Sequence, residues 1–337
     1  MRPLYLFILG EPVESRKRTV PEGWLIQRDR ESPPFPSLSR GVACSAGRRR
    51  GVSRRHFIGS ALLATAGVVF SRASEPSRWQ MGCYTRPWAQ YDYHVALDGI
   101  AAAGFKYAGL MSTKSKNGLI ISLTTTPEEA AAIGAEVKQR GLEVISMWAD
   151  QFTTDNTGGL KRLIENSAAC GCPNLLLGGT DEQHADAYYK VVAECCDYAE
   201  AKGVGLSVKP HGGSNANGAL CRKIIDRIAH KNFRLWYDPG NIFYYSDGKL
   251  DPVDDAAAVD GVVAGMSVKD FRPPKEVEIT PGTGKVDFAK VLSRLQQGGF
   301  THGPLVVECL DRGDLAHVNA EAVKARRFLE TLTGQKA

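Results

Sequence analysis

Short apolar runs alternate with polar, helix-like segments along most of this chain. Eight such runs recur at intervals of roughly thirty residues. They span residues 79–84, 107–111, 143–148, 174–179, 205–210, 234–238, 263–270 and 304–310. Parallel strands need a crossover helix between one strand and the next, and this spacing leaves room for one. The pattern therefore predicts a single α/β domain, a (β/α)8 TIM barrel, with a doubly wound open sheet as the alternative.

The segments between the apolar runs carry helix start and stop signals. In one of them, Thr126 can cap a helix, Pro127 fits the first turn, and Glu129 completes a capping box. Gly141 then favours the end of that helix. No GxGxxG motif follows the first apolar run, so the dinucleotide-binding form of the open sheet has little support.

The start of the chain has the layout of an export signal. Arg54 and Arg55 form a twin-arginine pair, an apolar region follows at residues 57–70, and small residues after it suit a cleavage site. The apolar region is short for a membrane span. We therefore predict a leader and twin-arginine signal peptide at residues 1–73 and a barrel domain at residues 74–337. The processed protein is expected in the periplasm or another extracytoplasmic space, without a stable membrane span.

The positive charge of the whole chain comes from this leader. The chain has 42 basic and 37 acidic residues, a formal charge of +5. Residues 1–73 hold 13 of the basic and 5 of the acidic residues, so 29 basic and 32 acidic residues remain and the charge becomes −3. Without a basic surplus, the processed chain shows no sign of a nucleic-acid partner.

Seven of the eight cysteines lie after residue 73. Their number is odd, and they lack the paired CxxC spacing of a zinc site. We expect most of them to be small buried hydrophobic residues, and the sequence leaves their disulfide state open.

Polar side chains follow several of the apolar runs where each run ends. In a barrel, chemistry gathers at the carboxyl ends of the strands. The ionisable groups there must pair, bind a cation, or face water and ligand, because an uncompensated buried charge is costly. The polar residues at these ends are Asp150, Lys209, His211, Asp238, Asn241, Lys269, Asp270 and Glu308.

Four fragments near these strand ends carry a family resemblance. "WYDPGN", "SVKDF", "TPGTGKVDF" and "GPLVVECL" occur in this order. They resemble the second half of the xylose-isomerase-like sugar isomerase/epimerase superfamily, whose barrels also include the endonuclease IV type of DNA-repair enzyme. The resemblance covers essentially the whole processed chain and is strongest from residue 204 to 311. It implies a divalent ion, commonly manganese or magnesium, held by Glu, Asp, His and Glu from strands 5 to 8.

This sequence keeps two of those four ligands. Asp238 matches the Asp and Glu308 the last Glu, whereas Lys209 and Ser267 replace the first Glu and the His. In one interpretation, the Lys209 ammonium replaces the metal ion between the two carboxylates. In the other, a manganese or magnesium ion is retained in a rearranged site. Its ligands would be Asp238, Glu308, His211 and Asp270. We favour the retained ion, because two carboxylates on adjacent strand ends are costly to hold together without one.

The resemblance implies a carbohydrate enzyme that acts on a sugar or keto-sugar, and the predicted signal peptide makes it an exported one. It would abstract a proton next to a carbonyl and so catalyse isomerisation, epimerisation or elimination. Glu308 would be the base, and Lys209 or His211 would return the proton on the other side. The predicted sugar contacts are Asn241, Lys269 and Trp148, whose indole can stack on a sugar face.

Two other functions remain open at this point. The first is a catalytically inactive sugar-binding protein on the same barrel, because a fold does not guarantee its function. The second is an endonuclease IV-like activity, which we rank third because it would need a basic groove and more metal-binding side chains. The sequence leaves the oligomeric state open.

Overall fold

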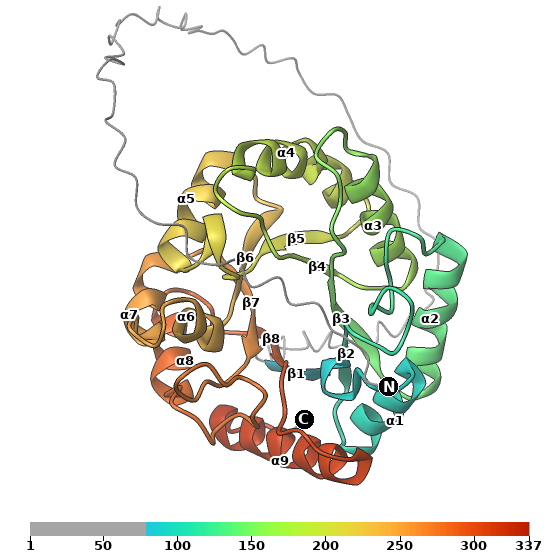
Figure 1. Ribbon diagram of the computed structural model, residues 1–337, viewed down its shortest axis with the longest axis vertical. Helices are drawn as coiled ribbons and strands as arrows, with labels where there is room; N and C mark the ends of the chain where they lie inside the picture. The colour runs from blue at the N-terminus through green and yellow to red at the C-terminus, as the bar shows by residue number, and fades with distance from the viewer. Residues whose placement is uncertain (1–78, 337) are drawn as a thin grey trace, which may run out of the picture. The chain divides into compact units, whose positions relative to one another are not determined.

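Each apolar run becomes one strand of a closed barrel (Figure 1). The computed structural model describes residues 79–336, so the predicted leader and the domain boundary at residue 73 lie outside the described part. The strands are β1 Trp79–Tyr84, β2 Tyr107–Leu110, β3 Glu143–Trp148, β4 Asn174–Leu177, β5 Gly205–Val208, β6 Phe233–Tyr237, β7 Val263–Val268 and β8 Gly303–Val307. The predicted TIM barrel is confirmed, and the open-sheet alternative is wrong.

Every strand pairs in parallel with the next strand along the chain, and the last strand pairs with the first. The closing pair places Met81 of β1 opposite Leu305 of β8. The pair formed by β5 and β6 is one example of two consecutive strands, and there Val208 lies opposite Leu235. Because all strands run the same way around a closed ring, their carboxyl ends meet at one end of the barrel. We call this end the mouth.

Helices surround the strands, as the ring of coiled ribbons in Figure 1 shows. They are α1 Tyr93–Ala102, α2 Pro127–Gln139, α3 Gly158–Ala169, α4 Ala185–Ala201, α5 Gly218–Ile228, α6 Pro239–Tyr245, α7 Pro252–Asp255, α8 Phe288–Gln297 and α9 Leu315–Thr333. The predicted capping box of α2 is present: Thr126 accepts a hydrogen bond from the Glu129 N–H, and the Glu129 side chain accepts one from the Thr126 N–H. No helix within residues 79–336 is long and apolar enough to cross a membrane.

The buried apolar residues form two clusters. Leu235 and Val307 belong to the larger cluster, which joins the outer face of the strands to the helices. Their strand neighbours Trp236 and Val306 belong to the smaller cluster. Because side chains alternate across a strand, the smaller cluster fills the barrel interior. Its other buried members are Tyr84, Met111, Ile145 and Leu176.

The seven cysteines of the described part are all buried and form no disulfide with one another. Cys83, Cys195 and Cys196, for example, have no solvent exposure. Burial raises the pKa of the Cys309 thiol to about 12, so this thiol stays protonated at neutral pH. The cysteines therefore serve here as small core residues, as the sequence predicts.

Candidate functional site

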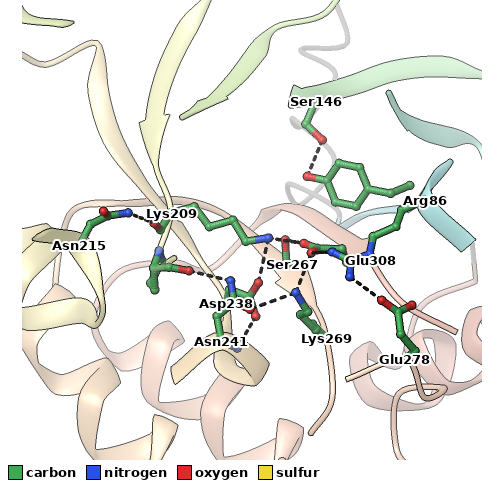
Figure 2. A network of polar contacts seen from close by, with 12 residues as sticks. Arg86, Ser146, Lys209, Asn215, Asp238, Asn241, Ser267, Lys269, Glu278 and Glu308 are labelled. Atoms are coloured by element: carbon green, nitrogen blue, oxygen red, sulfur yellow. Dashed lines mark hydrogen bonds and ion pairs between the residues drawn. The ribbon is translucent and has the colours of Figure 1, made fainter. Parts of the chain in front are cut away.

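Four charged side chains from the last four strand ends meet at the floor of the mouth. Lys209 follows β5, Asp238 follows β6, Lys269 follows β7 and Glu308 follows β8. All four are buried, with relative exposures of 1%, 0%, 4% and 1%. Figure 2 shows the Lys209 ammonium between the two carboxylates. The barrel topology thus brings together ionisable groups that the sequence separates by about thirty residues each.

Glu308 accepts from a donor on every side of its carboxylate. The Oε2 atom is paired with the Lys209 ammonium and accepts a hydrogen bond from Ser267 Oγ at 2.8 Å. The Oε1 atom lies 2.9 Å from Lys269 Nζ and 3.2 Å from Arg86 Nη1. A carboxylate has about four acceptor positions, so none of these positions is left for a further partner.

The charges around Glu308 decide its protonation. Burial alone would raise the pKa of its carboxyl group, but Lys209, Lys269 and Arg86 outweigh burial and hold the pKa well below its usual range. Burial lowers the pKa of Lys269, but Glu308, Cys309 and Asp238 together outweigh burial and raise the pKa above its usual value. Glu308 and Lys269 are therefore a buried ion pair at neutral pH.

Asp238 joins this cluster and also starts a helix. Its Oδ1 atom accepts the Asn241 N–H at 2.9 Å, which caps α6. Its Oδ2 atom lies 2.9 Å from Lys209 Nζ, within ion-pair range but without the direction of a hydrogen bond. Burial raises the pKa of Asp238, and the nearby Lys209 and Lys269 ammonium groups oppose this shift.

Asn241, one of the predicted sugar contacts, connects the charged cluster to the backbone beside it. Its Oδ1 atom accepts a hydrogen bond from Lys269 Nζ at 3.0 Å, and its Nδ2 atom donates to the Pro210 carbonyl at 2.7 Å. The residue is 2% exposed. Asn241 and Lys269 therefore orient the cluster, and their side chains are already engaged.

Aromatic side chains stand above the Lys209 end of the floor. The Lys209 Nζ atom lies 5.6 Å from the centre of a Trp148 ring, within cation–π range. The His211 ring is tilted against Trp148 at 5.1 Å and against Tyr245 at 5.6 Å. Gly178 makes room for the indole, because a Cβ atom there would lie 2.9 Å from it. These rings give the mouth an aromatic wall.

His211 keeps access to solvent at the rim, unlike the charged groups below it. Desolvation by the protein atoms around its ring lowers the pKa of His211, and the Lys209 and Lys269 ammonium groups lower it further. The imidazole is therefore neutral at neutral pH and has a nitrogen that can accept a proton.

Two residues of the site, Glu278 and Asn215, were not predicted from the sequence. Glu278 pairs with Arg86 and lies 3.7 Å from Arg312, so it fixes the guanidinium above Glu308. Asn215 donates from Nδ2 to the Gly178 carbonyl at 2.9 Å and to the Lys209 carbonyl, which fastens the loop after β5. Glu278 lies in a loop and Asn215 at the end of a single 3-10 turn, Gly213–Asn215. Neither segment has a periodic pattern, and only the glycines before Asn215 indicated a special backbone.

Asp270, predicted as a metal ligand, does not join the cluster. Its Oδ1 atom accepts the N–H groups of Phe271 and Val286, and its Oδ2 atom accepts those of Gly282 and Gly284. The carboxylate is thus used to hold the loop after β7 in place. Asp150 does not join the cluster either: its Oδ2 atom accepts the Leu123 N–H at 3.1 Å and its Oδ1 atom accepts the Gln151 N–H at 2.8 Å.

The residues of the mouth do not fit the divalent ion that the resemblance implies. A manganese-like or magnesium ion needs oxygen or imidazole ligands with free lone pairs. Here Glu308 is saturated by donors, and an ammonium lies between it and Asp238. His211 contributes ring contacts at the rim. This geometry argues against the retained-metal interpretation favoured from the sequence and agrees with the ammonium alternative.

Another group of possible ligands lies away from the mouth. Within the described residues, Asp197, Glu200 and His230 have ligand atoms within 4.8 Å of one another. His230 Nδ1 accepts the Asn232 N–H at 3.1 Å, so the neutral ring carries its proton on Nε2, which faces Asp197 at 3.0 Å. Glu200 pairs with Lys231 at 2.6 Å. The side chains of this group are thus paired with one another or with Lys231, and no independent observation indicates an ion there.

Comparison with known proteins agrees with this architecture. The family model described as xylose isomerase-like TIM barrel matches residues 97–332, more than two thirds of the chain. The chain belongs to this family. A comparison with curated proteins finds no match.

Solved structures with the same fold share little sequence with this member of the xylose isomerase-like family. The xylose isomerase domain protein from Planctomyces limnophilus is 17% identical, with a TM-score of 0.60, and the match covers 76% of this chain and 98% of that one. D-psicose 3-epimerase with D-tagatose from Clostridium cellulolyticum H10 is 13% identical, with a TM-score of 0.61, and the match covers 75% of this chain and 99% of that one. D-allulose 3-epimerase from Methylomonas sp. in complex with D-allulose is 17% identical, with a TM-score of 0.59, and the match covers 76% of this chain and 98% of that one. At these identities, the likeness establishes the fold.

Proposed function

We propose that this barrel acts on a free sugar or keto-sugar at its mouth as an isomerase/epimerase-type enzyme, by moving a proton next to a carbonyl. The observation that carries the proposal is the exposed, neutral His211 imidazole packed between Trp148 and Tyr245 above a fixed ammonium group. Aromatic rings suit the apolar face of a sugar. The epimerase structures that share this fold, one of them with D-allulose, support a sugar as the ligand.

The proton acceptor in this proposal is His211. A general base must have a free lone pair and must be unprotonated at working pH. Glu308, the base expected from the sequence, is unprotonated, but donors occupy every acceptor position of its carboxylate. His211 meets both requirements. The positive Lys209 ammonium would favour the negative charge that develops on the substrate oxygen after proton removal.

Proton abstraction can be measured without knowing the product. We would incubate the protein in D2O with a panel of aldoses, ketoses and keto-glycosides and follow the loss of proton NMR signals at carbons next to the carbonyl. We expect deuterium to enter with at least one sugar, and His211→Asn to slow this entry by roughly a hundredfold or more. His302→Asn, which changes an exposed histidine in the segment before β8, is the matched control and should leave the rate unchanged.

The second candidate is a sugar-binding protein without turnover. It is favoured by the saturation of Glu308, because charged groups that are fully paired with one another can position a ligand without reacting with it. Sugar binding by calorimetry without any deuterium entry would replace the enzyme proposal with this one. An endonuclease stays in third place, because the mouth lacks the free metal ligands that it would need.

We also propose that the protein acts outside the cytoplasm, which agrees with a free sugar as the substrate. The support is the twin-arginine segment at residues 54–55 and the apolar region at 57–70. Fractionation of cells that express the whole chain tests this: Arg54→Lys/Arg55→Lys should leave the protein in the cytoplasm, and an unchanged distribution would contradict export by this route.

A further inference from the structure

We infer that the Lys209 ammonium is a built-in replacement for a divalent ion and that the mouth is a metal-free site with a single positive charge in the ion's place. This inference concerns how the site is held together, so it stands whether or not the bound sugar is turned over.

The position of the Lys209 Nζ atom is that of a shared cation. It lies 2.9 Å from Asp238 Oδ2 and contacts Glu308 Oε2 directly, so it bridges the ends of β6 and β8 (Figure 2). Two buried carboxylates repel each other strongly in a medium of low polarity unless a cation separates them. Lys209 provides that cation from the end of β5, and its side chain is 1% exposed.

Of the four oxygens of the two carboxylates, only Asp238 Oδ2 accepts no hydrogen bond, and it faces the Lys209 ammonium. The oxygens of Glu308 also accept from Ser267, Lys269 and Arg86. The other oxygen of Asp238 is used by the Asn241 N–H. An incoming ion would have to displace several of these donors at once, and each displaced donor would be left buried and unpaired.

The local charge also opposes an added ion. Three cationic groups, Arg86, Lys209 and Lys269, already face Asp238, Glu308 and the rim residue Glu278, so the positive and negative charges balance. A further double positive charge would meet an ammonium within a few ångströms of any position between the carboxylates.

Lys209 is held in place both at its backbone and at its ammonium group, as expected for a side chain that permanently occupies the position of a metal ion. Its carbonyl accepts a hydrogen bond from Asn215, which in turn holds the Gly178 carbonyl. Its ammonium lies against the Trp148 ring. The side chain therefore has one preferred position, and its long stem is buried.

The test is manganese binding, measured by calorimetry and by the electron paramagnetic resonance of free Mn²⁺, for the wild type, Lys209→Glu and Lys209→Met. We expect no specific binding to the wild type. In Lys209→Glu, three carboxylates would converge, so about one ion per chain should bind, roughly a hundredfold more tightly than any wild-type binding. Lys209→Met removes the ammonium without providing a ligand, so it should bind little or no manganese.

Two results would overturn the inference. One is stoichiometric manganese binding by the folded wild type that is lost in both Asp238→Asn and Glu308→Gln. The other is a folded Lys209→Glu variant, checked by near-UV circular dichroism, that binds no manganese. If Lys209→Glu folds only with Mn²⁺ present, a metal-dependent rise in its Tm that is absent from the wild type gives the supporting result. These outcomes are independent of deuterium entry into sugars.

Discussion

At the scale of single residues, Glu308 shows how a buried carboxylate becomes tolerable. It sits at the end of an apolar strand with 1% exposure, where an unpaired charge would be costly. Lys209 and Lys269 supply two ammonium groups, and Ser267 supplies a neutral donor. Such a network adds little net stability over an apolar core, but removal of one partner exposes the full desolvation cost of the others. The network is therefore sensitive to the loss of any one charge.

We expect Glu308→Gln to lower the free energy of unfolding by about 3–5 kcal/mol, because it leaves Lys209 and Lys269 buried with too little negative charge. The measurement is urea denaturation at neutral pH. Glu278→Gln is the control: its side chain is 20% exposed and pairs with Arg86 at the rim, so it should cost about 1 kcal/mol or less. An equal fall in the free energy of unfolding of the two variants would show that burial does not make the loss of a charge in this network more costly.

At the scale of elements, the junctions between strands and helices carry most of the specific polar contacts. Asp238 follows β6 and caps α6, and Asp255 connects α5, β6 and α7. The Asp255 carboxylate accepts the Gly218 N–H at the start of α5 at 3.0 and 3.1 Å, and it contacts the Tyr237 hydroxyl of β6 at 3.2 Å. Asp255 itself ends α7. One side chain thus joins α5, β6 and α7.

Asp255 makes the stability of this junction depend on pH. Burial raises its pKa from 3.8 to about 6 in the folded protein. Between these values, the folded protein keeps a proton that the unfolded chain has lost, so stability falls as pH rises through this window, by roughly 2–3 kcal/mol in total. We expect Asp255→Asn to remove this part of the pH dependence, measured as the free energy of unfolding at pH 4.5, 5.5 and 7.

The control for this measurement is the neighbouring, exposed residue Asp254. Asp254→Asn should follow the wild-type curve. If the difference in stability between Asp255→Asn and the wild type stays constant across the three pH values, the carboxyl group of Asp255 does not titrate in this window.

At the scale of the whole molecule, the barrel is filled by large rings placed opposite glycines. A Cβ atom on Gly265 would lie 2.4 Å from the Trp236 ring, and one on Gly109 would lie 2.2 Å from the Tyr84 ring. The two aromatic side chains are fully buried in the interior cluster. The missing side chains on one strand therefore make space for the rings of the neighbouring strand, and the closed ring of strands depends on this fit.

We expect Gly265→Ala to destabilise the protein by about 1–3 kcal/mol, because the added methyl group would have to displace the Trp236 ring within a close-packed interior. Gly205→Ala is the matched control on β5: the nearest atom to its added Cβ would be 3.5 Å away, in ordinary contact. Thermal unfolding of both variants measures the difference. A Gly265→Ala variant as stable as Gly205→Ala would mean that the interior can relax at no cost.

The sequence predicted the strands well, because each one is buried on both faces and reads as a continuous apolar run between helix signals. It also located the charged strand ends, since parallel strands in a barrel must end together. It could not predict how those charges pair. Arg86 and Glu278 are 192 positions apart, in the segments after β1 and β7. The donors that saturate Glu308 depend on the directions of side chains in three dimensions. The choice between a metal ion and an ammonium group depends on these contacts.

The bridging lysine also has a consequence for how this barrel can change over generations. Lysine and glutamate codons differ only in their first base, so a single nucleotide change at position 209 would exchange a fixed ammonium for a third carboxylate beside Asp238 and Glu308. With the ammonium in the place of an ion, a variant with glutamate at position 209 would depend on a divalent metal ion from its surroundings, which the present protein does not need.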